Sequence, residues 1–108
     1  MAYQLPLRRL FSPIVINRTE IRNRLVLPAM HLGYTPGGFI SEKLTDFYLE
    51  RAQGGLGMII IGGCTIDEYS GMSEMIALHD DRFIEGLSKL AQAVQNQGAR
   101  LFAQLYQA

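Results

Sequence analysis

Several residue types are scarce or missing in this chain, and each shortage narrows what the chain can be. Among 108 residues there is one cysteine and no tryptophan. One cysteine cannot form a disulfide within the chain, so we expect a reducing environment and a cytoplasmic location. Charge of one sign is not in excess, because ten Lys and Arg balance ten Asp and Glu. This neutral balance argues against nucleic acid or a membrane surface as a partner.

Long hydrophobic runs are also absent. The longest candidate, residues 56–66, is well short of the roughly 20 apolar residues that a membrane-spanning helix needs. The first residues are polar or charged where a signal peptide has an apolar core. The two histidines and five methionines show no metal-ligand spacing, so no metal site is expected. With 48% hydrophobic and 19% charged residues, the composition is that of one globular domain at most.

Three short apolar runs occur at regular intervals along the sequence, and a stretch with a helical pattern lies between each run and the next. The runs cover residues 25–31, 58–65 and 101–106. Each is apolar on both faces, as a parallel strand covered on two sides must be. Ahead of them, two extended pieces at 14–16 and 19–21 flank an Asn-Arg pair, and Asn tolerates the left-handed conformation of a tight turn. This predicts a β-hairpin that closes the N-terminal mouth of a barrel.

The two intervening stretches carry the caps and the apolar stripe of amphipathic helices. Ser41 is the predicted N-cap of the first helix, which ends at the glycines 54–55 because glycine adopts positive φ easily. The aspartates 80–81 cap the second helix, and Gly98 closes it. With right-handed crossovers, this order of strands and helices fits either the start of a (β/α)₈ barrel or part of an open doubly wound sheet.

Parallel strands end at the same edge of a sheet, where α/β proteins keep their ligand sites. The turn after the first strand reads Pro-Ala-Met-His-Leu-Gly, so it lacks the Gly-x-Gly-x-x-Gly of a dinucleotide site. A Walker-type loop is missing too, and nucleotide phosphates are not expected at this turn. The candidate residues at this edge are Pro28, Ala29, Met30, His31, Gly62, Gly63 and Gln104.

Several separate motifs follow one another along the chain. They are Leu-Phe-Ser-Pro at 10–13, Ile-Arg-Asn-Arg-Leu-Val-Leu-Pro-Ala-Met at 21–30, Phe-Tyr-x-x-Arg-Ala-x-Gly-Gly at 47–55, Leu-His-Asp-Asp at 78–81, Gly-Ala at 98–99 and the strand that holds Gln104. In this order they closely resemble the opening of the Old Yellow Enzyme family of flavin-dependent oxidoreductases, from Leu10 onward. His31 after Met30 looks most like the branch of 2,4-dienoyl-CoA reductases and enoate reductases, because classical members more often have Cys or Thr there.

The resemblance implies a (β/α)₈ barrel that binds FMN across the C-terminal edge of its strands. Residues 1–108 would then be the N-terminal portion of this single FMN-binding domain, with its first three strands. Pro28, Ala29, Met30 and His31 would line the isoalloxazine, partly through backbone groups. Gly63 would let the ring approach the second strand without a Cβ in the way, and the Gln104 amide would hydrogen-bond the pyrimidine edge.

In such enzymes NAD(P)H reduces the FMN, and hydride passes to the C=C bond of an α,β-unsaturated carbonyl or enoyl thioester. A full barrel takes about 250 residues, so the proton donor and the phosphate-binding residues are expected outside this chain. The same holds for the iron–sulfur cluster and FAD that longer members carry. The alternative is a non-catalytic barrel piece that folds only by self-association, as a homo-oligomer, or with complementary segments. We expect the 108 residues alone to be inactive.

Each nominated residue also has a structural interpretation. A glutamine within an apolar strand needs a partner for its amide, and a backbone group serves as well as a ligand. His31 alone fits a hydrogen-bonded structural histidine. The pair Gly62-Gly63 fits a β-bulge as well as a cofactor contact. Cys64 is expected to be a small buried hydrophobe and not a catalytic thiol.

Overall fold

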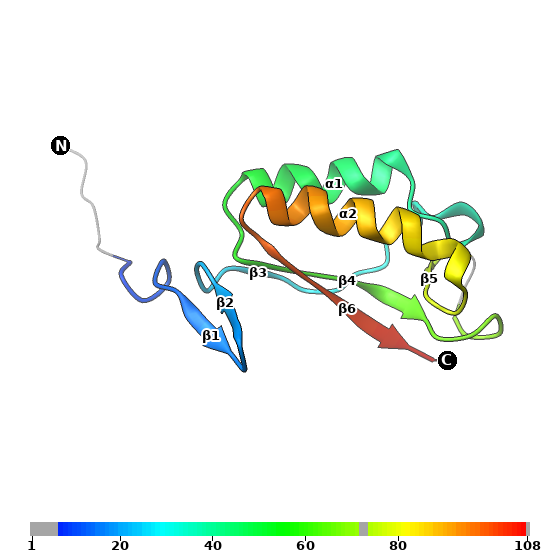
Figure 1. The fold of residues 1–108 in the computed structure, drawn as a ribbon, viewed down its shortest axis with the longest axis horizontal. Coiled ribbons are helices and arrows are strands. Elements are labelled where there is room, and N and C mark those ends of the chain that lie inside the picture. The colour runs from blue at the N-terminus through cyan, green and yellow to red at the C-terminus, as the bar shows by residue number, and fades with distance from the viewer. Residues whose placement is uncertain (1–6, 72–73, 108) are drawn as a thin grey trace.

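The computed structural model describes residues 7–71 and 74–107 of the chain (Figure 1). Two helices cover one face of a parallel sheet, and a small hairpin precedes them. The elements in chain order are β1 (Ile14–Ile16), β2 (Thr19–Ile21), β3 (Val26–Leu27), η1 (Pro36–Gly38), α1 (Glu42–Gln53), β4 (Met58–Thr65), β5 (Ile76–Ala77), η2 (Asp81–Phe83), α2 (Ile84–Asn96) and β6 (Arg100–Tyr106).

The central strand of the sheet is β4, which has the predicted bounds. It pairs in parallel with β6 from Met58 to Thr65. β3 pairs in parallel with the start of β4, and β5 with its end. Because β6 occupies one edge of β4 throughout, β3 and β5 share the other edge. The mixed α/β fold with a parallel sheet agrees with the predicted fold class.

Three details of the sheet differ from the prediction. The expected first strand, residues 25–31, is paired only at Val26–Leu27, because Pro28 has no N–H to continue the ladder. The strand β5 was not expected, since two residues are too few to show a periodic pattern. β6 begins one residue earlier than predicted, at Arg100.

The helices begin and end largely where their sequences indicate. The Ser41 hydroxyl oxygen accepts a hydrogen bond from the Leu44 N–H at 3.1 Å, and Gly55 follows α1 with φ +107°. Asp80 caps the 3₁₀ turn η2 and not the α-helix itself, so α2 begins only at Ile84. The expectation that the aspartates cap the second α-helix directly was therefore wrong by one turn.

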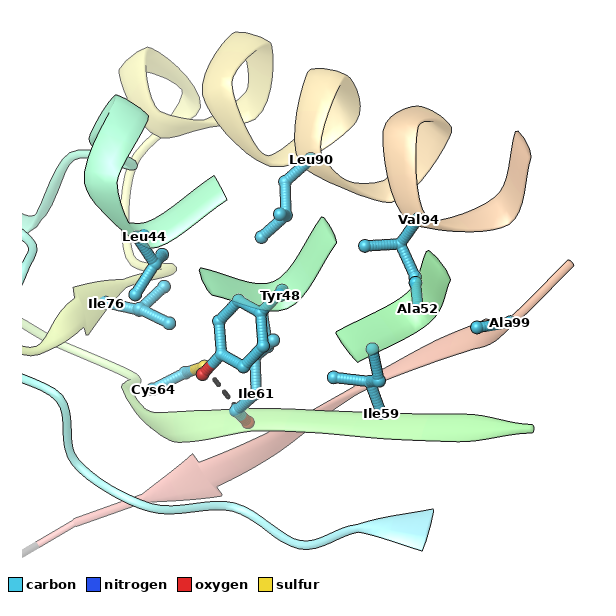
Figure 2. Packing of buried hydrophobic residues seen from close by; sticks show 10 residues of the cluster. All are labelled: Leu44, Tyr48, Ala52, Ile59, Ile61, Cys64, Ile76, Leu90, Val94 and Ala99. Carbon is cyan, nitrogen blue, oxygen red and sulfur yellow. Dashed lines mark hydrogen bonds between the residues drawn. The ribbon is translucent and has the colours of Figure 1, made fainter. Parts of the chain in front are cut away.

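The hydrophobic core lies between the two helices and the sheet (Figure 2). Ile59 and Ile61 of β4 are 0% and 1% exposed and belong to one cluster with Tyr48 of α1 and with Leu90 and Val94 of α2. This burial fixes which face of β4 carries the helices. Successive side chains on a strand point to opposite faces, so Met58 and Ile60 point away from the helices.

The opposite face of the sheet is uncovered in the described part of the chain. Ile60 lies on it together with its β6 partner Phe102, which is 37% exposed, and Val26 of β3 is 43% exposed. Apolar side chains on this face agree with the prediction of strands covered on both sides. None of the helices in the described ranges is long and apolar enough to span a bilayer.

The hairpin forms as predicted. β1 and β2 are antiparallel, and Asn17 in the turn between them has φ +57°. The hairpin lies beside the ends at which β4 and β6 begin, where Arg100 Nε donates a hydrogen bond to the Glu20 carbonyl at 3.0 Å (Figure 1). It is therefore on the N-terminal side of the parallel strands, opposite the edge where the candidate site residues gather.

Candidate functional site

The register of the sheet brings three of the candidate segments to one level. Leu27 pairs with Ile59, and Ile59 pairs with Leu101. Each of these paired residues is followed, three positions later, by a candidate residue: Met30, Gly62 and Gln104 respectively. The expected convergence at the C-terminal edge is therefore present in the order β3, β4, β6.

β4 has a bulge at this level, because the pair Gly62-Gly63 stands opposite Gln104 alone. Gly62 has φ +140°, and a Cβ on it would lie 3.0 Å from the Gln104 Cβ and 3.1 Å from its carbonyl oxygen. A Cβ on Gly63 would lie 2.8 Å from the Tyr106 Cβ and 2.9 Å from the Met75 Cε. Both positions need glycine for the close approach of β6 and the neighbouring loop. Packing within the chain therefore explains both glycines, as the β-bulge interpretation predicts.

Gln104 lies on the open face of the sheet. Its neighbour Ala103 pairs with buried Ile61 and shares the helix side, so the Gln104 side chain points to the other side. The side chain is exposed, and its amide makes no hydrogen bond to any residue that the structure describes. The backbone partner considered for this amide is therefore not found there. A free primary amide offers two donors and one acceptor to a ligand.

The segment after β3 lies beside this bulge. Pro28, Met30 and His31 are exposed and Ala29 is half-buried. Met30 and His31 line a small cavity of about 10 Å³ together with both glycines of the bulge. Such a cavity has room for about one water molecule. The segment and the bulge therefore border the same small space, which is far too small for an organic cofactor.

Larger hollows lie elsewhere. One of about 350 Å³ is lined by residues of 65–79 and by the η1 turn, and one of about 230 Å³ by the hairpin and the start of β6. Neither includes any of the six residues predicted to contact a cofactor. The candidate site is an open surface across three strand ends and not an enclosed pocket.

Two buried polar side chains lie beneath the bulge, on the helix side of the sheet (Figure 2). Cys64 is 0% exposed, and its Sγ is 3.8 Å from the Ile61 carbonyl oxygen as a weak donor. Burial raises the pKa of the Cys64 thiol to about 11, so it is not a reactive thiol. Burial chiefly, with the charge of a Cys64 thiolate, raises the pKa of Tyr48 to about 12, and a Gly62 backbone hydrogen bond opposes the rise.

Tyr48 was not among the predicted site residues. In the sequence it belongs to the apolar stripe of the first helix, where nothing distinguishes it from a core aromatic residue. Only the structure shows that its side chain lines the small cavity with Met30, His31 and the glycine bulge. The signal available was weak: a hydroxyl on an otherwise apolar face needs a partner when it is buried.

The comparison with protein families agrees with this geometry. The family described as "NADH:flavin oxidoreductase / NADH oxidase" matches residues 9–108. The chain belongs to this family. Proteins of this family use FMN with NAD(P)H, and the resemblance to Old Yellow Enzyme is confirmed.

Related proteins are much longer than this chain. A metal reductase from Desulforamulus reducens is 52% identical over 99 residues, which are 92% of this chain and 15% of the relative. The crystal structure of Old Yellow Enzyme from Pichia sp. matches with a TM-score of 0.83 at 24% identity, over 92% of this chain and 26% of that one. A 2-naphthoyl-CoA reductase complex matches with a TM-score of 0.84 at 26% identity, over 90% of this chain and 15% of that one. The described fold therefore corresponds to part of the flavin oxidoreductase barrel.

The residues present fit a flavin of this family. A flat ring with a polar edge needs an approachable apolar surface and a donor–acceptor group beside it. The open face supplies the surface, and Gln104 supplies a free amide at its C-terminal edge. None of the six predicted residues except His31 has an ionisable side chain, so binding at this part of the site relies on shape and hydrogen bonds.

Proposed function

We propose that residues 1–108 are the N-terminal portion of one FMN-binding (β/α)₈ barrel domain, and that a longer polypeptide supplies the remaining strands. The observation that carries the proposal is the common level of Met30, the glycine bulge and the free Gln104 amide on the uncovered sheet face. The family match over residues 9–108 and the 15% coverage of the metal reductase support it.

In this proposal each segment has a separate role toward FMN. Gln104 donates and accepts hydrogen bonds at the pyrimidine edge of the ring. The backbone and side chains of Pro28, Ala29, Met30 and His31 line the isoalloxazine. Gly63 lets the ring approach the second strand without a Cβ in the way. When bound, FMN supplies the transfer of hydride from a nicotinamide to an acceptor; the protein orients the ring.

We further propose that the acceptor is an activated C=C bond conjugated to a carbonyl, in an enone or an enoyl thioester. The match to a reductase whose structure contains an aromatic acyl-CoA supports a thioester substrate. His31 after Met30, which resembles the dienoyl-CoA and enoate reductase branch, supports the same class. A second candidate is the reduction of a metal ion, which the 52% identity to a metal reductase favours.

One experiment separates these possibilities. The longer protein that contains this chain is purified anaerobically, its flavin content is measured by visible absorption, and NADH or NADPH oxidation is followed with one acceptor at a time. The acceptors are a 2,4-dienoyl-CoA, a cyclic enone and ferric citrate. Oxidation that depends on the dienoyl-CoA or the enone, with the reduced product identified by mass spectrometry, is expected. Turnover with ferric citrate alone would favour the second candidate, and absence of FMN would contradict both.

A further inference from the structure

Glu74 has a backbone conformation that its residue type rarely adopts. Its φ is +61°, in the left-handed region where residues other than glycine, asparagine and aspartate seldom occur. Residues held in such a conformation cluster at functional sites, where the surrounding structure fixes them. Glycine would be free of this strain, so a glutamate at this position indicates a use for its side chain.

Two contacts fix the Glu74 backbone. The Thr35 hydroxyl donates a hydrogen bond to the Glu74 carbonyl, and Thr35 is only 1% exposed. Met75, the next residue along the chain, is 6% exposed, and its Cε lies beside Gly63 of the bulge. The loop after β4 is thereby joined to the segment after β3. Because both contacts are buried, the direction in which the Glu74 side chain leaves the backbone is fixed.

The Glu74 side chain reaches the turn that carries His31. Both residues line the small cavity beside the glycine bulge. Their polar atoms also approach one point, because the ideal Cβ position of Gly33 is 3.7 Å from Glu74 Oε2 and 3.8 Å from His31 Nε2. The carboxylate and the imidazole are thus neighbours beside the same glycine.

Both groups are available to each other. In the described part of the chain, no hydrogen bond or ion pair involves the Glu74 carboxylate or the His31 imidazole. Both side chains are exposed and can rotate, so a direct hydrogen bond or one bridging water can join them. The partner of an imidazole determines which ring nitrogen carries the proton and how the ring is oriented. A carboxylate at position 74 can therefore orient the His31 ring.

We infer that Glu74 is a positioning residue for the flavin site: its carboxylate orients the His31 imidazole at the surface that binds FMN. This inference rests on the proposed function, in which His31 lines the isoalloxazine. It assigns no chemical step to Glu74, which acts through His31.

The test is a double-mutant cycle in the full-length flavoprotein, with Glu74→Gln, His31→Leu and both together. Apoprotein is titrated with FMN by fluorescence, and the visible absorption band of the bound flavin is recorded. When His31 is present, Glu74→Gln is expected to raise the Kd for FMN about three- to tenfold and to shift the band. In the His31→Leu background, the same substitution is expected to change neither.

Glu68→Gln is the matched control. Glu68 is an exposed residue of the same loop and lines the larger hollow of this loop, but it does not line the small cavity with His31. Glu68→Gln removes the same charge and should bind FMN like the wild type.

A further variant separates the side chain from the backbone. Glu74→Gly adopts the left-handed conformation without strain, so its melting temperature should equal or exceed that of the wild type. Its Kd for FMN should nevertheless rise as in Glu74→Gln. A lower melting temperature with an unchanged Kd would mean that Glu74 serves the fold, which overturns the inference.

The outcomes separate this inference from the proposed function. A wild-type protein that binds no FMN overturns both. If the wild type binds FMN, equal effects of Glu74→Gln with and without His31 overturn the inference alone, because Glu74 then acts independently of the imidazole. An unchanged Kd and band in Glu74→Gln, or the same changes in Glu68→Gln, also overturn it.

Discussion

Two polar side chains of this chain differ in whether they have hydrogen-bond partners within the protein. Arg22 directs its guanidinium at three backbone carbonyls, whereas the Gln104 amide makes no hydrogen bond in the described part of the chain. A polar group that already has protein partners serves the fold. An unpaired amide on an apolar sheet face is available to a ligand, and it costs little in its absence because water reaches it.

The first prediction concerns this amide. Gln104→Leu in the full-length flavoprotein removes the hydrogen bonds proposed for the pyrimidine edge while it leaves an apolar side chain of similar size. We expect the Kd for FMN to rise about tenfold or more, because each lost hydrogen bond contributes on the order of 1 kcal/mol. Fluorescence titration of the apoprotein measures the change. Gln92→Leu, at an exposed position of α2, is the matched control and should bind FMN like the wild type. Equal affinities in both variants would contradict the role of Gln104.

The second prediction concerns pH. Burial raises the pKa of Cys64 from 9.0 to about 11 and chiefly accounts for the rise of Tyr48 from 10.0 to about 12. Both groups ionise more easily in the unfolded chain. Their contribution to stability is therefore fully present below about pH 9 and is lost as the pH rises through 11 and 12. Cys64→Ala removes one of the two groups.

The measurement is the melting temperature of wild type and Cys64→Ala at several pH values. The variant begins lower at pH 7, because a buried sulfur has been removed. Between about pH 9 and 11 its melting temperature should fall less steeply than that of the wild type. The slopes test the prediction and the absolute values do not. Parallel curves over this range would contradict the prediction, because they would mean that folding does not change the pKa of the Cys64 thiol.

At the scale of elements, a single arginine joins the hairpin to the ends of both helices. Arg22 follows β2 directly, and its guanidinium donates to the carbonyls of Ala52 and Leu56 at 2.9 Å and of Gln97 at 2.7 Å. These carbonyls lie at or just after the C-termini of α1 and α2, where helices leave acceptors unpaired and favour positive charge. The hairpin is thus held against the N-terminal side of the sheet by charge-assisted bonds.

The third prediction follows from this arrangement. Arg22→Met keeps most of the aliphatic stem and removes all the donors, so we expect a loss of about 2 kcal/mol in the free energy of unfolding. Arg18→Met, at an exposed position in the turn of the hairpin, should change stability by less than about 0.5 kcal/mol. Urea denaturation followed by circular dichroism compares the two variants with the wild type. A similar small effect in both would mean that the carbonyls are satisfied equally well by water.

The elements could be predicted from the sequence where a local rule decides them. The bounds of β4 follow from an apolar run between glycines and polar residues, and Ser41 caps α1 as its position indicates. The early end of β3 follows from Pro28, whose effect on the ladder was underestimated. β5 and the place of Tyr48 beside the small cavity depend on contacts between segments distant in sequence, and no local pattern predicts such contacts. The candidate site was predicted mostly through the family resemblance, and the register adds that its three segments share one level.

At the scale of the whole molecule, the described chain has a sheet with one uncovered face, and β6 forms a long unpaired edge of it. In the described residues β6 pairs only with β4, so its outer backbone groups are free. Leu105 near its end is 68% exposed, although its β4 partner Cys64 is fully buried on the same face. The helices pack on the start of β6, where Leu101 joins the core, but leave its C-terminal end exposed. An exposed apolar edge strand of this kind pairs readily with other chains.

The last prediction is that the 108 residues, expressed alone, associate through this edge and do not oxidise NAD(P)H with an enone. Sedimentation velocity over a range of concentrations should show species larger than the 12.1 kDa monomer. Leu105→Lys places a charge on the edge strand and should shift the population toward monomer. Ile84→Lys is the control, because Ile84 is 55% exposed at the start of α2 and belongs to no strand. If both variants reduce association equally, general hydrophobicity and not the β6 edge drives it. A monomer at all concentrations would mean that the open sheet needs no further strands, which would count against the barrel proposed for the longer protein.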